Sequence, residues 1–352
     1  MIKRPKLSLM IHTASFDTFL ESQGIKSYFE SLCKNLCEQS LKEIELIYTD
    51  TFYEFNKNNF HEITKKLPFV VKHVPIHKNH RYYFDKGYTY ISAAKNTGIL
   101  YADGELLVTC DDAEFFPNHL LALYYDYFTK GNYMIAMHNR MKSIVTNNGI
   151  PVFPIKGDIY INDHRFRAFS GQSLVHRNGT WTYAGTSFSL EDALIMNGFN
   201  EKMDSCKSLE DCEFGSRLQM LGRSFVSDKN GILYILDHQS YSTMVRTAGF
   251  HEDGQVSELD CHLPTKKNID NLIAIENYGI CQCTTTFKEI TANKITVTDK
   301  HLEIIQRETI KYRGFDPLAD DNKEKMNIWM NVPNFDLASE RQELRNSPEW
   351  RW

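Results

Sequence analysis

The chain has 352 residues, of which 42% are hydrophobic and 12% aromatic, and it carries a formal net charge of −5 with a pI near 6.2. This composition supports one large domain or a domain with an appendage, and it lacks the basic character typical of nucleic-acid-binding proteins. No window approaches the roughly 20 apolar residues of a membrane span, and the N-terminus lacks the apolar run of a signal peptide. The eight cysteines are scattered, as in reduced proteins, so we expect a cytoplasmic protein without a membrane span.

The first third of the chain alternates short apolar runs with a helical pattern. Leu7–His12 and Ile44–Tyr48 read as strands, and between them Ser27–Glu38 has apolar residues at helical spacing. Strand, helix and strand in this order predict a right-handed βαβ unit, and Asp50 follows its second strand at the edge where such sheets bind ligands. Phe69–Val74 reads as a third strand. We therefore expect an open α/β sheet.

Two adjacent carboxylates follow a predicted strand at its carboxyl end, where such sheets bind ligands. A small-residue helix begins near Ser92, a turn follows at Gly104–Glu105, and the buried-looking strand Leu106–Cys110 runs directly into Asp111 and Asp112. Carboxylates at the carboxyl end of a parallel strand are well placed to hold Mg²⁺ or Mn²⁺ against phosphate oxygens. The alternative from the residues alone is a solvated acidic loop that caps the next helix.

The second half of the chain has shorter and more varied elements. We expect helices at Leu120–Phe128 and Leu190–Phe199, the latter ending at Asn197-Gly198, and one or two hairpins within the polar segment Asn139–Arg167. Strands are predicted at Tyr133–His138, Ser173–His176, Ser224–Val226 and Ile232–Leu236.

A second acidic cluster opens another helix. Glu210, Asp211 and Glu213 precede an apolar face of Phe214, Leu218 and Leu221, and Gly222 ends the pattern. Acids in a first helical turn are favoured by the helix dipole, so a purely structural capping role is one interpretation. The other is catalysis, since a transferase needs one carboxylate to take the proton of an acceptor hydroxyl.

Together the two acidic clusters and their surroundings resemble the family 2 glycosyltransferases of the GT-A fold. The resemblance rests on AKNTGI, ADGELL and DDAEFFP, followed in the same order by NGFNEKMDSCKSLEDCEFGSRLQMLG. It implies a Rossmann-like open mixed sheet flanked by helices over residues 1–240, with a nucleotide-sugar half at about 1–130 and an acceptor half at 131–240. Residues 241–352 would then form a C-terminal extension of unknown role. The chain departs from the family at Cys110, where the usual Asp-x-Asp motif has its first acid.

The resemblance also implies roles for individual residues on the donor side. Asp112 would hold the metal, and Asp111 would face the ribose or share the metal. Asp50 would accept a hydrogen bond from the base, Thr13 would pass under the same nucleotide, and Lys95 would contact phosphate or base. His238 falls where some members have a further metal ligand, although a histidine at a strand end is more often structural.

On the acceptor side, the resemblance assigns Asp211 as the catalytic base and Glu210 as the residue that orients the acceptor or its loop. The implied activity is a hexosyltransferase reaction that uses Mn²⁺ or Mg²⁺ and a nucleotide sugar, with a UDP-sugar favoured, and inverts the anomeric centre. The acceptor needs a hydroxyl, which a glycan offers most readily and a protein or nucleic acid also carries. Two alternatives stay open: a retaining transferase, which a metal-bound His238 would favour, and an inactive nucleotide- or glycan-binding module, which Cys110 suggests.

The resemblance ends near Tyr241. Beyond it, Asn268–Ile275 and Thr298–Thr309 have helical patterns, and the tail from Asn334 is highly charged. Cys261-His262 and Cys281-x-Cys283 do not have the spacing of the usual zinc-ligand pairs.

Overall fold

The structure is a computed structural model that describes residues 4–15, 17–81, 91–161, 164–177, 179, 182–201, 210–236 and 335–350. Its centre is a five-stranded sheet in the order β12-β4-β1-β2-β3. Four of these strands run parallel and the edge strand β12 is antiparallel to β4, so the sheet is mixed. The strands are β1 (Leu7–Thr13), β2 (Ile44–Asp50), β3 (Val70–Val74), β4 (Leu106–Cys110) and β12 (Thr186–Ser189).

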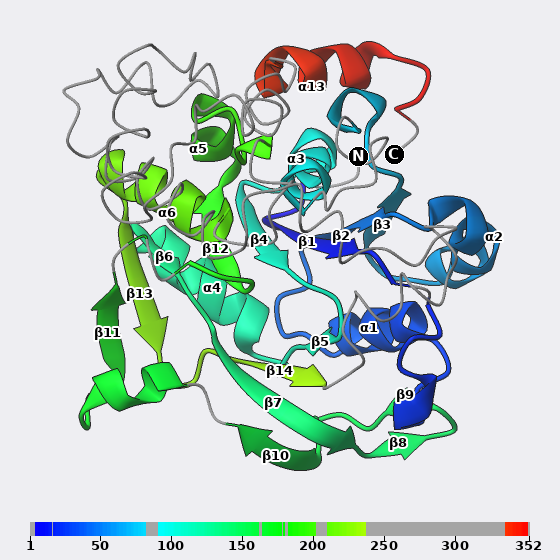
Figure 1. The fold of residues 1–352 in the computed structure, drawn as a ribbon, viewed down its shortest axis with the longest axis vertical. Coiled ribbons are helices and arrows are strands. Elements are labelled where there is room, and N and C mark those ends of the chain that lie inside the picture. The colour runs from blue at the N-terminus through cyan, green and yellow to red at the C-terminus, as the bar shows by residue number, and fades with distance from the viewer. Residues whose placement is uncertain are drawn as a thin grey trace, which may run out of the picture.

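Helices cover both faces of this sheet, because alternate side chains of each strand point to opposite sides. In β1, Leu7, Leu9 and Ile11 pack with α1 (Tyr28–Cys37) and α2 (Tyr53–Thr64), whereas Met10 packs on the face of α3 (Ile91–Tyr101). Figure 1 shows α1 and α3 on opposite sides of β1 and β2. The predicted open mixed α/β sheet flanked by helices is therefore confirmed.

The second half of the chain builds smaller sheets around α4 (Leu120–Thr129). One four-stranded sheet has the order β10-β7-β14-β5, and a three-stranded sheet has the order β11-β13-β6. Two further helices, α5 (Leu190–Ile195) and α6 (Glu210–Met220), pack on the α3 side of the core. The remaining elements are β5 (Glu114–Phe115), β6 (Asn132–Met134), β7 (Met137–Ile144), β8 (Thr146–Asn147), β9 (Ile150–Pro151), β10 (Gly157–Ile161), β11 (Leu174–Arg177), β13 (Ser224–Asp228), β14 (Ile232–Leu236), and the 3-10 turns Glu21–Gln23, Lys78–His80 (η2) and His164–Phe169.

One expected strand is divided into two. The apolar run at Tyr133–His138 predicts a single strand, but β6 pairs with β13 while β7 pairs with β10 and β14. The chain changes sheets at Ile135 and Ala136, whose amides donate to Val226 and Gly185 respectively. All four residues from 134 to 137 are buried, so hydrophobicity alone gives no sign of the break.

The structure also contains a C-terminal helix that the charged sequence does not suggest, α13 (Leu337–Asn346). Its Leu337 and Leu344 join the hydrophobic core on the α3 side, and Figure 1 shows α13 beside the upper end of α3. Arg341 is buried and donates from Nη1 to the carbonyls of Ile99 (3.1 Å) and Leu100 (2.6 Å). These carbonyls belong to the last turn of α3, where the regular helical hydrogen bonds end, and Ile99 also accepts from the amide of Ala102 over 3.4 Å. The helix therefore packs on α3, and Asn197 beside α5 also bonds to its first residue, Leu337; the predicted domain boundaries stay predictions.

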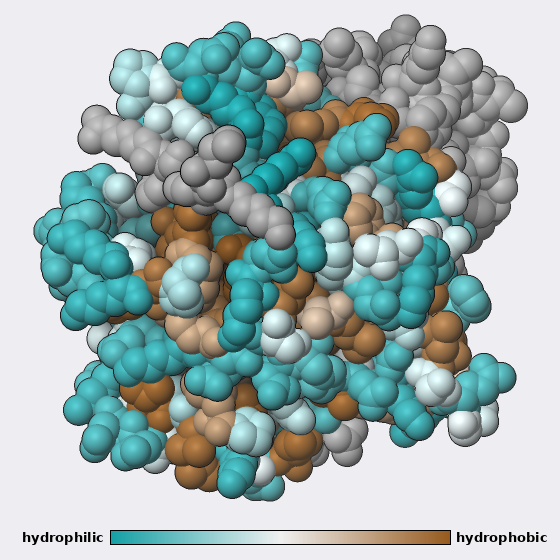
Figure 2. Space-filling view, turned by 180° about the vertical axis from the view of Figure 1, so that it is seen from behind, coloured by the Kyte–Doolittle hydropathy of each residue, from teal (hydrophilic) through white to brown (hydrophobic). Residues whose placement is uncertain are grey.

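The surface opposite to the view of Figure 1 mixes hydrophilic and hydrophobic residues, and the hydrophobic ones form small separate groups (Figure 2). Within the described ranges, no helix combines the length and the hydrophobicity that a bilayer crossing requires.

The Arg341 contact gives a first testable prediction. Arg341→Met should lower the free energy of unfolding by about 1.5–3 kcal/mol, because a charged donor is lost and two helix-end carbonyls are left without it. The neighbouring exposed residue provides a control, and Gln342→Ala should stay within about 0.5 kcal/mol. Urea unfolding of the three proteins measures this, and equal losses in both variants would show that the α13 contact adds nothing specific.

Candidate active site

Asp111 and Asp112 lie at the carboxyl edge of the central sheet, next to the end of β1. The parallel register pairs Ile11 with Cys110, so the residues that follow these two positions also come together. His12 Nε2 lies 2.9 Å from Asp111 Oδ1, and Thr13 Oγ1 donates to Asp112 Oδ2 over 2.9 Å. The adjacency of two parallel strands thus builds a polar group from two stretches far apart in sequence.

Asp111 is the more accessible of the two acids, with 54% of its side chain exposed. Partial burial alone would raise its pKa, but the nearby His12, Lys95 and His138 hold the pKa of this carboxyl well below its usual range. Asp111 is therefore ionised at neutral pH. An ionised, accessible carboxylate beside a second one is a suitable pair of ligands for a hard divalent cation.

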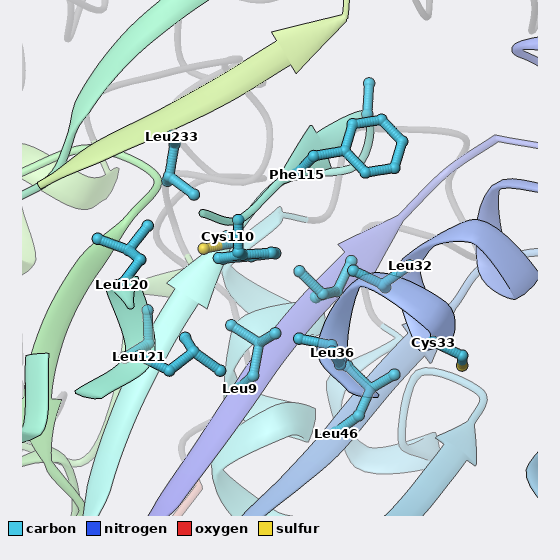
Figure 3. Close-up of a cluster of buried hydrophobic side chains, with 14 of the residues drawn as sticks. Leu9, Leu32, Cys33, Leu36, Leu46, Cys110, Phe115, Leu120, Leu121 and Leu233 are labelled. Atoms are coloured by element: carbon cyan, nitrogen blue, oxygen red, sulfur yellow. The ribbon is translucent and has the colours of Figure 1, made fainter. Parts of the chain in front are cut away.

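Cys110, at the position of the family's first acid, does not face this edge. Its side chain lies in the hydrophobic core with Leu9, Leu120 and Phe115 (Figure 3). Burial and the nearby carboxyl group of Glu114 raise the pKa of the Cys110 thiol well above its usual range, so the thiol is neutral. The site therefore has its two acids at positions 111 and 112, and Cys110 contributes packing.

A sharp backbone turn follows the two acids. Ala113 is fully buried and has a φ of 62°, a left-handed conformation that costs a non-glycine residue roughly 1–2 kcal/mol. Its carbonyl accepts from the amide of Leu236 over 3.0 Å, which anchors the turn to β14. Next comes Glu114, a buried carboxyl beside the Cys110 thiol, whose pKa is raised well above its usual range by burial and by Asp111. Glu114 is thus a neutral acid close to the ionised Asp111.

Lys95 connects α3 with the second acidic cluster. It is only 1% exposed, and its Nζ donates to Glu210 Oε1 over 2.8 Å and to Asp211 Oδ1. The ammonium also lies 5.1 Å from the centre of the Phe199 ring. The sequence predicts Lys95 as a phosphate or base contact. In the structure it instead neutralises the acids that open α6, and a contact with a nucleotide stays a prediction.

Asp211 differs from Glu210 in its exposure and is suited to proton transfer. Its side chain is 17% exposed, against 8% for Glu210. Burial raises the pKa of Asp211 to about 7; Lys95 opposes this rise, while the negative charges of Glu210 and Asp111 add to it. The influence of Asp111 also shows that the two acidic clusters are close enough for their charges to interact. A base with a pKa near neutrality is the kind that proton abstraction requires.

Asp50, the predicted base contact, is fully buried at the end of β2. Its Oδ1 accepts from the amide of Phe52 (2.7 Å), and its Oδ2 accepts from Asn56 Nδ2 (2.9 Å) and lies 2.8 Å from His73 Nε2. These bonds fix the turn from β2 into α2. One of them would have to open before Asp50 could meet a nucleotide, so that contact stays a prediction.

The structure thus brings Thr13 to Asp112, and Lys95 to Glu210 and Asp211. His238, the third predicted metal ligand, lies outside the described residues. Sequence reasoning missed His12 and His138, which both act on Asp111. His12 could have been found, because it occupies the strand position beside Asp111. The sequence offers no such indication for His138, because it lies at the start of β7, after the change of sheets at Ile135 and Ala136 that the sequence does not predict.

No family model matches the chain, and no curated protein matches it. Among solved structures, the chain is similar to two crystal structures of S. aureus TarS 1-349. In the complex with UDP the TM-score is 0.43 at 13% identity, and in the complex with UDP-GlcNAc it is 0.46 at 11% identity. In both, the likeness covers 96% of this chain and 92% of the TarS chain.

The Lys95 contacts give a second prediction. Lys95→Met should lower the free energy of unfolding by about 3–5 kcal/mol at neutral pH, because two buried carboxylates lose their counter-charge. The loss should shrink as the pH falls through about 7, since protonation of Asp211 removes a charge that Lys95 neutralised. Lys130→Met, which breaks an exposed pair with Asp126, should cost only about 0–1 kcal/mol. A pH-independent loss at Lys95, measured by urea unfolding, would contradict this electrostatic account.

Proposed function

We propose that this chain is a glycosyltransferase that moves a hexose from a nucleotide sugar, with a UDP-sugar favoured, to an acceptor hydroxyl with inversion. The observation that carries the proposal is the meeting of two acidic clusters with different properties. The Asp111–Asp112 pair is accessible and includes a carboxylate with a lowered pKa, whereas Asp211 is held near neutrality by burial. Cation binding and proton abstraction need these two different states of a carboxyl group.

The residues at the end of β4 fit a divalent cation. Asp112 and Asp111 offer oxygen ligands, and Mg²⁺ or Mn²⁺ binds through one or two carboxylates while substrate phosphates and water complete the shell. When bound, such an ion supplies the positive charge that neutralises a diphosphate leaving group. Thr13 orients Asp112 through its hydroxyl, and His12 orients Asp111. His238 is proposed as a further ligand on the resemblance alone.

In the proposed reaction, the acceptor oxygen attacks the anomeric carbon as the bond between that carbon and the diphosphate oxygen breaks. The hydroxyl proton goes to Asp211, whose raised pKa makes it a stronger base than an ordinary aspartate. Glu210 is more deeply buried and bonded to Lys95, so it holds the start of α6 in place and orients the acceptor loop. Thr13, Lys95, Asp111 and, after rearrangement, Asp50 are the proposed donor contacts. A glycan is the proposed acceptor class.

The donor site can be tested before the acceptor is known. In a thermal-shift screen of nucleotide sugars with and without Mn²⁺, one donor should raise the melting temperature in a metal-dependent way. Asp112→Ala should abolish this stabilisation while leaving the fold intact, because a partly exposed acid contributes little to the core. Asp126→Ala, at an exposed acid on α4, is the matched control and should respond like the unmodified protein. Normal metal-dependent binding in Asp112→Ala would rule out the proposed cation ligand.

The base assignment makes a sharper prediction. Asp211→Asn keeps the size of the side chain but cannot take a proton, so turnover should fall by roughly 10²–10⁴-fold while donor affinity survives. Glu210→Gln should be milder. In the unmodified protein, turnover should fall as the pH drops through about 7, because protonation of Asp211 removes the base. Donor calorimetry and kcat against pH measure these effects.

The outcomes of that experiment separate the candidate roles. A dead Glu210→Gln with a normal Asp211→Asn would exchange the roles of the two residues. Full activity in both variants would leave the two acids as helix caps only. Proton NMR of the anomeric linkage in the product distinguishes inversion from retention, and donor binding without any transfer or hydrolysis would identify a binding module.

A further inference from the structure

A second cluster of ligand-type side chains lies away from the proposed active site, where α13 meets the η2 turn. His80 is the last residue of η2, His77 directly precedes η2, and Glu340 lies on α13. One potential ligand atom from each residue lies within 4.8 Å of the others. His80 Nε2 and Glu340 Oε2 are 2.9 Å apart, although the residues are separated by 260 positions in the sequence. Only the tertiary fold brings these groups together.

His80 is held in the orientation that a metal-binding histidine needs. Its Nδ1 contacts Glu201 Oε1, and the same oxygen accepts from Asn96 Nδ2 over 2.8 Å. The second ring nitrogen, Nε2, is thereby directed toward Glu340. Histidines that bind metals characteristically have their other ring nitrogen fixed by a carboxylate or a carbonyl in this way.

His77, the N-cap residue of η2, adds a second imidazole to the cluster. Its Nδ1 accepts from the amide of Asn79 at 3.4 Å, so Nε2 is the ring nitrogen left to bind an ion. The ring centres of His77 and His80 are 5.8 Å apart. One ligand-type atom of His77 thus lies within 4.8 Å of those of His80 and Glu340.

We propose that His77, His80 and Glu340 bind a divalent transition-metal ion of the zinc class, with Glu201 as the residue that positions His80. Two imidazole nitrogens and one carboxylate oxygen form a donor set that suits Zn²⁺, and a water molecule completes the tetrahedron. The all-carboxylate pair at Asp111 and Asp112 is chemically different and suits Mg²⁺ or Mn²⁺. This second site is independent of the proposed transferase activity.

The competing account is a buried imidazolium clamped between two carboxylates. Nδ1 of His80 contacts Glu201 and Nε2 lies 2.9 Å from Glu340, so a protonated ring would donate to both carboxylates. A metal ion would take the place of the Nε2 proton. The two accounts differ at His77, which a metal site requires and an imidazolium clamp does not.

The proposed ion would fasten the C-terminal helix to the nucleotide half. Glu340 is one residue before Arg341, which caps α3, so metal binding and helix capping would act on the same turn of α13. Glu201 in turn accepts from Asn96, the neighbour of Lys95. The metal would therefore stabilise the end of the chain beside the helix that carries Lys95.

Titration of the metal-free full-length chain with Zn²⁺ and with Co²⁺ tests the proposal. We expect one tight site whose cobalt spectrum shows nitrogen and oxygen ligation, without the sulfur-to-cobalt charge-transfer band that cysteine ligands would give. Loss of an outer-shell partner of a metal ligand typically weakens metal affinity by roughly 10–100-fold, so Glu201→Gln should weaken zinc binding within that range. His77→Ala removes a direct ligand and should weaken zinc binding by at least as much. His61→Ala, at an exposed histidine of α2, should bind as the unmodified protein does.

Two further results complete the test. Asp112→Ala should bind zinc as tightly as the unmodified protein while losing the manganese-dependent donor binding. The zinc proposal can therefore fail or succeed separately from the proposed transferase site. Zinc affinity unchanged by His77→Ala, a cysteine-type cobalt spectrum, or no tight zinc binding by the unmodified chain would each overturn the proposal. Circular dichroism of metal-free His77→Ala checks that its fold is retained, as expected for a residue outside the His80 ion pairs.

Discussion

The proposed active site depends on the buried ion pairs that Lys95 forms with Glu210 and Asp211. One positive charge on α3 faces two carboxylates at the start of α6, and without it those acids would repel each other in a largely dry environment. The same contact joins α3, which packs on the central sheet, to α6 in the second half of the chain. Lys95 thus helps to hold the start of α6 and opposes the rise in the pKa of Asp211 that burial causes.

Although Glu210 and Asp211 share the positive charge of Lys95, they differ in their burial. Glu210 takes the more buried place, and Asp211 keeps an exposed edge and a raised pKa. At the end of β4 the opposite condition holds, since surrounding imidazoles and Lys95 stabilise the negative charge of Asp111. The contrast arises from position in the fold, because all of these groups are ordinary carboxylic acids.

The sequence predicts the four parallel strands of the central sheet, because buried strands such as Leu106–Cys110 are continuous apolar runs that end in polar residues, but it gives no sign of the antiparallel edge strand β12. The Asp111–Asp112 pair follows from the same strand pattern, whereas Glu210 and Asp211 stand out at the start of a helical pattern. It cannot predict that Asp50 is enclosed by His73 and Asn56, since this depends on how α2 packs, and α2 shows few apolar residues at helical spacing. It also misses α13, whose only deeply buried apolar residues are Leu337 and Leu344 in an otherwise charged segment.

The capping of α3 by Arg341 has a consequence for biosynthesis. Chains are made from the N-terminus, and domains begin to fold while synthesis continues. The central sheet can form early, but the last carbonyls of α3 meet their guanidinium donor only after every other described element has left the ribosome. The contacts that cap α3 can therefore form only after the residues of the central sheet have all been made.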